Sequence, residues 1–287
     1  MTAIIKKEMR SYFTSMIGYV LLAGFVFFNA LMFTLVCIQY KAPDYSFVMS
    51  ASAVIFLVMI PLLTMRLFAE ESGKKTDQLL YTAPVRISSI VAGKFLSAFL
   101  FLLFAMAITM LFPLSVSAFG ALPAAKIAGS FLGYALLGGA FISVGMFVSV
   151  LTSSQITAAF GTFGGLFVFY ILGAVVQAVP TDTTTSVVFV CLLLAVFCYI
   201  LFDATRNIFA GLGTCIVGLA VIIGIALKNP LLYDGVIVKF LNWFSLTTRF
   251  GNFTNGILNL SDIVYYITFT LAFIYFTINV IEKRRWR

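Results

Sequence analysis

The 287-residue sequence contains no histidine, which removes several kinds of chemistry at once. A Ser-His or Cys-His nucleophilic pair cannot be assembled without imidazole. The four cysteines, Cys37, Cys191, Cys198 and Cys215, all fall inside apolar runs, and none belongs to a Cys-x-x-Cys pair. Because this spacing is not that of metal ligands, we expect free thiols that pack as small hydrophobic side chains. We predict no metal site and no catalytic residue.

Charged residues are also scarce, at 10% of the chain against 62% hydrophobic residues. A soluble protein carries about 25% charged residues, so this chain lacks the polar side chains to cover a soluble globule. The composition predicts an all-α polytopic membrane protein. The net charge of +8 forms no clustered basic face, which argues against nucleic acid as a partner.

No Asp or Glu lies in the middle of an apolar run. Acidic groups at bilayer depth mark ion and proton paths. Their absence from the sequence argues against a proton- or sodium-coupled transporter and against an intramembrane aspartic protease.

Long apolar runs, each about 20 residues and with at most one charged residue, predict eight membrane spans within a single transmembrane domain that covers residues 1–287. The fourth and fifth are separated at residues 152–155, the most polar tetrapeptide of a long uncharged run. The sixth and seventh are the least certain, and six spans are the alternative. The expected spans are residues 16–38, 45–65, 90–118, two within 127–181, 183–202, 207–227 and 263–281.

Two amphipathic segments flank these spans. Residues 2–15 divide into an apolar and a charged face at helical spacing, which is typical of a helix that lies in the headgroup plane. Residues 228–262 contain a second such stretch, with Trp243 as an interfacial anchor, and a re-entrant element is the alternative. Thirteen of the eighteen Lys and Arg residues lie on the side of both termini and of residues 70–88, so we expect that side to be cytoplasmic.

The most polar stretch runs from Glu70 to Arg86, between two apolar runs. Its Gly-Lys-Lys-Thr at 73–76 is not a phosphate loop, because position 68 is Phe and Lys75 separates Lys74 from Thr76. We therefore expect no nucleotide or other cofactor in this chain. Residues 76–81 are expected to form a short helix that Pro84 ends, and Ser88 or Ser89 to cap the next helix. Such a stretch is suited to docking a partner.

Small residues recur four positions apart at 129 and 133, 135 and 139, and 161 and 165. This spacing lets helices approach closely, either inside one bundle or between two copies.

Residues 62–71, 76–85 and 90–95, together with 258–262 and 282–286, closely resemble ABC-2 type permeases, with the gliding-motility and nitrous-oxide-accessory branch as the nearest. The resemblance implies an ABC-2 (type V exporter-like) transmembrane bundle with an elbow helix at 2–15, a coupling helix at 74–82, a short second cytoplasmic loop at 152–155 and re-entrant helices within 231–260. Eight spans depart from the commonest six-span plan of that family.

The resemblance also implies partners: cytoplasmic ABC ATPase subunits that bind ATP and Mg, a second permease subunit of the same or a related chain, and in some complexes an auxiliary protein with an extracytoplasmic domain. It implies an exporter in a bacterial cytoplasmic membrane. A complex that transmits force or a signal, and an ATP-independent transporter, are the alternatives; the sequence does not indicate the substrate. The expected ATPase-coupling residues are Glu70, Glu71, Lys74, Lys75, Thr76, Asp77, Gln78, Leu79, Leu80, Tyr81 and Thr82.

Overall fold

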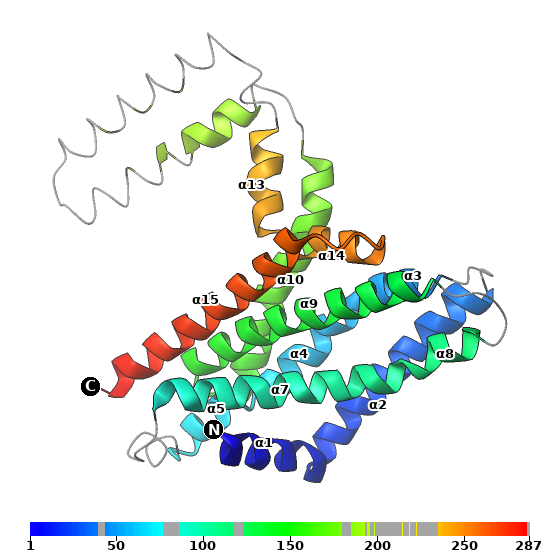
Figure 1. The fold of residues 1–287 in the computed structure, drawn as a ribbon. Helices are drawn as coiled ribbons and strands as arrows, with labels where there is room; N and C mark the ends of the chain where they lie inside the picture. The colour runs from blue at the N-terminus through cyan, green and yellow to red at the C-terminus, as the bar shows by residue number, and fades with distance from the viewer. Residues whose placement is uncertain are drawn as a thin grey trace. The chain divides into compact units, whose positions relative to one another are not determined.

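The computed structural model describes residues 1–39, 44–76, 86–117, 123–179, 185–192 and 235–285, with single positions at 194, 195, 198, 214, 218 and 222. Most of these residues are helical, and no strand occurs among them (Figure 1). The chain forms two compact units, Met1–Tyr170 with Leu246–Arg287, and Ile171–Ser245. The first unit carries the candidate site.

The first unit is a bundle of long apolar helices with short helices at its ends. In Figure 1, α7 and α9 run alongside each other, and α1 lies against α7. The elements of the unit are α1 (Thr2–Thr14), α2 (Met16–Phe33) with a π-helical end (Thr34–Gln39), α3 (Tyr45–Ser52), a 3-10 turn (Ala53–Ile55), α4 (Phe56–Thr64), α5 (Ala69–Gly73), α7 (Ile87–Thr109), α8 (Leu111–Ser117), α9 (Ala124–Leu151), most of α10 (Gln155–Ala178), α14 (Leu246–Thr254) and α15 (Leu260–Arg285).

Within the described ranges, six helical segments are long and apolar enough to cross a membrane. The chain is therefore a multi-pass membrane protein, as the composition predicts. The predicted sixth and seventh spans, 183–202 and 207–227, lie largely outside the described residues, so they stay predictions. The six segments are Met16–Gln39, Tyr45–Gly73, Ile87–Ser115, Ala124–Leu151, Gln155–Val176 and Leu260–Arg285.

Several predicted boundaries are confirmed. The segment predicted at 2–15 is helical, as α1, and α9 and α10 are separated at residues 152–154. The predicted cap of the third span is wrong: α7 begins at Ile87, so Ser88 and Ser89 already lie in its first turn. Arg86 occupies the N-cap with extended backbone and no side-chain cap hydrogen bond.

Helix α9 is the central element of the first unit, and it packs against α3, α4, α5, α7, α14 and α15. Its glycines permit these contacts. A Cβ at Gly133 would lie 2.6 Å from the Phe253 side chain, and one at Gly138 would lie 2.3 Å from Leu102 Cδ2. Gly161 of α10 faces Val148 of α9. The predicted close approach of helices at small residues therefore occurs between helices of this chain.

Two polar links fasten the end of the bundle that lies away from α1 and α5. Asp262, at the start of α15, accepts hydrogen bonds from Arg249 Nη1 at 2.9 Å and Asn252 Nδ2 at 2.8 Å, which holds α14 on α15. Asp44 caps α3 by accepting from the Ser46 N–H at 3.1 Å, and it also pairs with Lys126 of α9.

The second unit contains α13 (Val236–Phe244), which confirms the predicted amphipathic helix in the 228–262 segment. Its Trp243 is 61% exposed and makes an edge-to-face contact with Phe244 at 5.1 Å.

Candidate functional site

The second candidate span ends in a turn that helix α9 holds in place. The backbone N–H groups of Phe68 and Ala69 donate to Ser149 Oγ at 3.2 and 3.1 Å. The first N–H groups of a helix have no partner within that helix, so Ser149 satisfies donors at the start of α5. At the other end of α5, a Cβ on Gly73 would lie 2.8 Å from the Ser153 carbonyl oxygen. Both ends of α5 therefore lie against the end of α9 and the turn after it.

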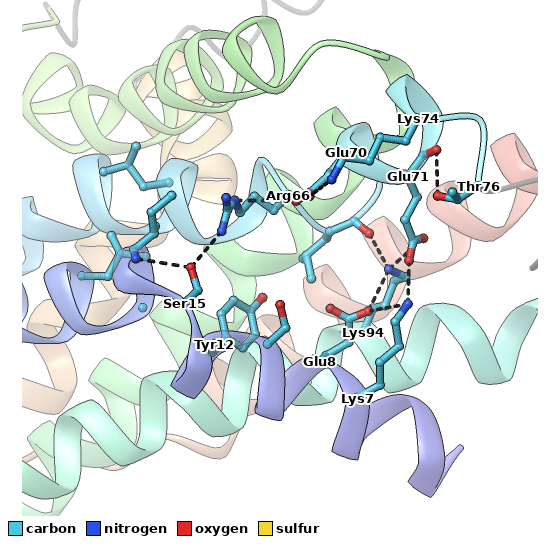
Figure 2. A pocket seen from close by; sticks show the side chains of 16 residues that line it. Lys7, Glu8, Tyr12, Ser15, Arg66, Glu70, Glu71, Lys74, Thr76 and Lys94 are labelled. Carbon is cyan, nitrogen blue, oxygen red and sulfur yellow. Dashed lines mark hydrogen bonds and ion pairs between the residues drawn. The ribbon is translucent and has the colours of Figure 1, made fainter.

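Lys94 of α7 is the centre of the site. Its Nζ lies 3.1 Å from Glu8 Oε1 and 3.0 Å from Glu71 Oε2, and it donates to the Leu67 carbonyl oxygen at 2.6 Å (Figure 2). Its side chain is only 2% exposed. An ammonium group has three donors, and a buried charge is tolerated when it is paired. Glu8 Oε1 and the Leu67 carbonyl accept hydrogen bonds from Lys94 Nζ, and Glu71 Oε2 forms an ion pair with it. These partners belong to α1, the turn before α5 and α5, so Lys94 joins all of these to α7.

Helix α1 is seated on α7 by close contacts as well as by charge. A Cβ at Gly93 would lie 3.1 Å from Ile4 Cγ2, and the rings of Tyr12 and Phe101 are 5.1 Å apart. At the corner between α1 and α2, a Cβ at Gly18 would lie 1.9 Å from the Tyr12 carbonyl oxygen. Only a residue without a Cβ fits there, so Gly18 fixes how α1 turns into the first span.

Further ion pairs surround Lys94. Lys7 Nζ lies 3.1 Å from Glu71 Oε1, and Lys74 Nζ lies 2.7 Å from Glu70 Oε1. Burial lowers the pKa of Lys7, but the combined effect of Glu71, Glu8 and Glu70 outweighs burial, so the pKa is raised above the usual 10.5. Arg66 Nη1 donates to Ser15 Oγ at 3.2 Å, and this links the end of the second span to the start of the first.

The chain leaves α5 through a Schellman motif. The Thr76 N–H donates to the Glu71 carbonyl at 2.9 Å, and the Lys75 N–H donates to the Ser72 carbonyl at 3.2 Å. This pairing places Lys75 in the left-handed region, with φ 57°, where glycine is the usual residue. Lys74, Lys75 and Thr76 are exposed beyond this point.

A cavity of about 330 Å³ lies between α1 and the α4–α5 turn. Both charged and apolar residues line it. The residues that line it are Lys7, Glu8, Ser11, Tyr12, Ser15, Ile17, Gly18, Leu21, Leu62, Arg66, Leu67, Glu70, Glu71, Lys74, Thr76 and Lys94.

Of the predicted coupling residues, the structure describes Glu70, Glu71, Lys74, Lys75 and Thr76, and it brings all but Lys75 to this cavity. Both glutamates are engaged in ion pairs inside the protein. The others, Asp77, Gln78, Leu79, Leu80, Tyr81 and Thr82, lie outside the described residues, as does most of the short helix predicted at 76–81.

The sequence analysis missed Lys94, Glu8 and Ser149 as parts of the site. Lys94 had a visible signal, since it is a single charge within a long apolar run after Gly93. Glu8 falls on the charged face of α1, yet its side chain is only 14% exposed because it pairs with Lys94. Nothing in the sequence marks Ser149. Among the described residues, no group of three or more Cys, Asp or Glu side chains is placed to hold a metal ion.

Comparison with known proteins gives one match. A family model described as "ABC-2 family transporter protein" covers residues 35–281. The match does not distinguish the gliding-motility and nitrous-oxide-accessory branch from the rest of the family. No curated protein and no solved structure matches the chain significantly.

Proposed function

This chain belongs to the ABC-2 family of transporter proteins, and from that membership we propose that it is the permease subunit of an ATP-driven exporter. ATP and Mg bind to a separate ATPase subunit, which supplies the hydrolysis. This chain provides the path across the membrane and the surface that receives the movement of the ATPase.

The structural observation that supports the proposal is the set of contacts that Lys94 makes with Glu8, Glu71 and the Leu67 carbonyl. The exposed residues Lys74, Lys75 and Thr76 follow directly on α5, which Glu71 ties to Lys94 and Ser149 ties to α9. We call residues 74–82 the coupling loop. A displacement of the coupling loop would therefore move α1, α7 and α9 together. In this arrangement Glu70 and Glu71 hold the base of the loop, while Lys74, Lys75, Thr76 and the residues 77–82 contact the ATPase.

The proposed transport cycle is one of alternating access. Closure of two ATPase subunits on ATP moves the coupling loops of two permease subunits, and the bundles open on the opposite side. Both termini and the coupling loop then lie in the cytoplasm, in agreement with the bias of Lys and Arg. A second permease, of the same or a related sequence, completes the path.

Cysteine crosslinking tests the proposal. Lys74→Cys and Gln78→Cys, each in a chain whose native cysteines are replaced by Ala or Ser, are expected to crosslink to a co-expressed ABC ATPase. Lys239→Cys, an exposed position of α13 expected on the opposite side of the membrane, is the matched control. Capture of the ATPase from neither coupling position, or equally from Lys239→Cys, would contradict the proposal.

A further inference from the structure

Two buried donors face the cavity between α1 and the α4–α5 turn without a hydrogen-bond partner among the residues that the structure describes. These are Tyr12 Oη and Arg66 Nε. The Tyr12 side chain is almost fully buried, and Glu70 Oε2 lies 3.7 Å from Arg66 Nε, too far for a hydrogen bond. A buried donor without an acceptor costs about 1–3 kcal/mol, so two of them in one cavity indicate a missing partner.

The chemistry of these donors identifies the class of that partner. A guanidinium group donates only, and burial raises the pKa of the Tyr12 hydroxyl, so this group stays protonated and donates as well. A partner for these two donors therefore offers acceptor atoms, while the acceptor Glu71 Oε2 at the same cavity, which also has no hydrogen-bond partner among the described residues, keeps its ion pair with Lys94. Figure 2 shows both side chains at this cavity, with Arg66 also bound to Ser15.

The formal charge of the lining favours an anion. Four cations meet three carboxylates at this cavity, which leaves one positive charge in excess. The cations are Lys7, Arg66, Lys74 and Lys94, and the carboxylates are Glu8, Glu70 and Glu71. A guanidinium group is especially suited to phosphate, because its planar fork donates two parallel hydrogen bonds.

Apolar residues also line the cavity: Ile17, Gly18, Leu21 and Leu62, of which the first three belong to the start of the first candidate span. The cavity has a volume of about 330 Å³, far more than a single water molecule occupies. A free inorganic phosphate would leave these apolar residues uncovered, whereas a lipid would cover them.

We propose that this cavity binds the phosphate group of an anionic phospholipid, with Arg66 and Tyr12 donating to its oxygens and the lipid chains lying along Ile17, Leu21 and Leu62. The bound lipid fills the cavity between α1 and the rest of the bundle and adds to the contacts that hold α1 there. The proposal rests on this cavity alone and does not depend on the coupling function.

Native mass spectrometry of the purified full-length chain tests it, with phosphatidylglycerol, a phosphate-free diacylglycerol glycolipid and inorganic phosphate as separate probes. We expect the protein to retain phosphatidylglycerol in preference to the glycolipid. Arg66→Gln and Tyr12→Phe should each weaken that retention by about tenfold, the loss expected for one hydrogen bond to a charged group. Arg66→Lys, which keeps the charge but loses Nε, should weaken it as well and serves if Arg66→Gln does not fold.

Matched controls lie close by. Arg10→Gln removes an exposed charge from the same helix α1, and Tyr19→Phe removes a hydroxyl from a tyrosine that is 59% exposed. Both should leave retention unchanged. Equal retention by Tyr12→Phe and Tyr19→Phe, or of the two lipids, would overturn the proposal. Binding of inorganic phosphate with the same dependence on Arg66 and Tyr12, without lipid retention, would overturn the assignment to a lipid.

Discussion

Lys94 Nζ lies 3.0 Å from Glu71 Oε2, and this ion pair joins the beginning of one candidate span to the end of the one before it. The pair sits among Glu8, Lys7 and the Leu67 carbonyl, so neither charge depends on a single partner. The base of the coupling loop is consequently held by a charged group in the body of the bundle.

Replacing Lys94 should destabilise the protein strongly. Lys94→Gln removes the positive charge that pairs with the mostly buried carboxylates of Glu8 and Glu71. Removing one partner of a buried ion pair costs about 3–5 kcal/mol. We expect a clear fall in the thermal unfolding temperature of the purified chain in detergent. Lys283→Gln, at the exposed end of α15, should change nothing.

The double variant Lys94→Met with Glu71→Gln separates charge from packing. Because it removes both members of the pair, it should be less destabilised than Lys94→Met alone. A double variant as unstable as the sum of its single variants would show that the ion pair is not the cause.

Gly18→Ala should disturb the corner between α1 and α2. The new Cβ would meet the Tyr12 carbonyl oxygen at 1.9 Å, and this atom is backbone that cannot turn away. We expect a loss of about 1–3 kcal/mol, the usual cost of overpacking, measured as the free energy of unfolding in denaturant. Gly24→Ala in the same helix meets nothing within 4 Å and should be neutral or stabilising, since Ala favours helix over Gly. Similar losses in both variants would contradict this account.

Lys75→Gly should stabilise the protein. Lys75 adopts φ 57°, a conformation that costs a side-chain-bearing residue about 1 kcal/mol and glycine almost nothing. The unfolding temperature should therefore rise slightly. Lys74→Gly removes the same charge type from a residue with φ −86° and should give no such gain. A loss of stability in Lys75→Gly would contradict this account, because it would mean that the lysine side chain stabilises the fold by more than its left-handed backbone conformation destabilises it.

Asp44 should make stability depend on pH in the acid range. Burial raises its pKa, but hydrogen bonds from Lys126 and Ser46 outweigh this and lower the pKa below 3.8. A carboxyl group whose pKa falls on folding stabilises the protein above its unfolded pKa, and the contribution is lost as pH falls through the folded pKa.

Asp44→Asn should therefore be less stable than the wild type at about pH 7, by up to about 1 kcal/mol because the pair is partly exposed. The difference should shrink at about pH 3, where Asp44 in the wild type is increasingly protonated. Unfolding measured at both pH values tests this, and an equal difference at both would contradict the assignment of the effect to charge.

The helices could be predicted from the sequence because length and hydropathy decide where a chain crosses a membrane. The break between α9 and α10 and the bounds of α1 follow from local composition. The site could be predicted only in part. Glu70 and Glu71 stand out as charges beside an apolar run, but their partner Lys94 and the role of Ser149 depend on contacts between distant segments. The prediction that Ser88 or Ser89 caps α7 is wrong, because the local preference of serine for the N-cap did not decide where α7 begins.

The central position of α9 has a consequence for how the protein is made. Its surface at Gly129 and Gly133 is covered by Phe253 of α14, and α15 also packs against α9, so both covering helices leave the ribosome after α9. Until they are inserted, a bare face with Gly133 remains in the bilayer. A chain truncated before α14 should thus be degraded faster by membrane proteases than a chain that includes α14 and α15.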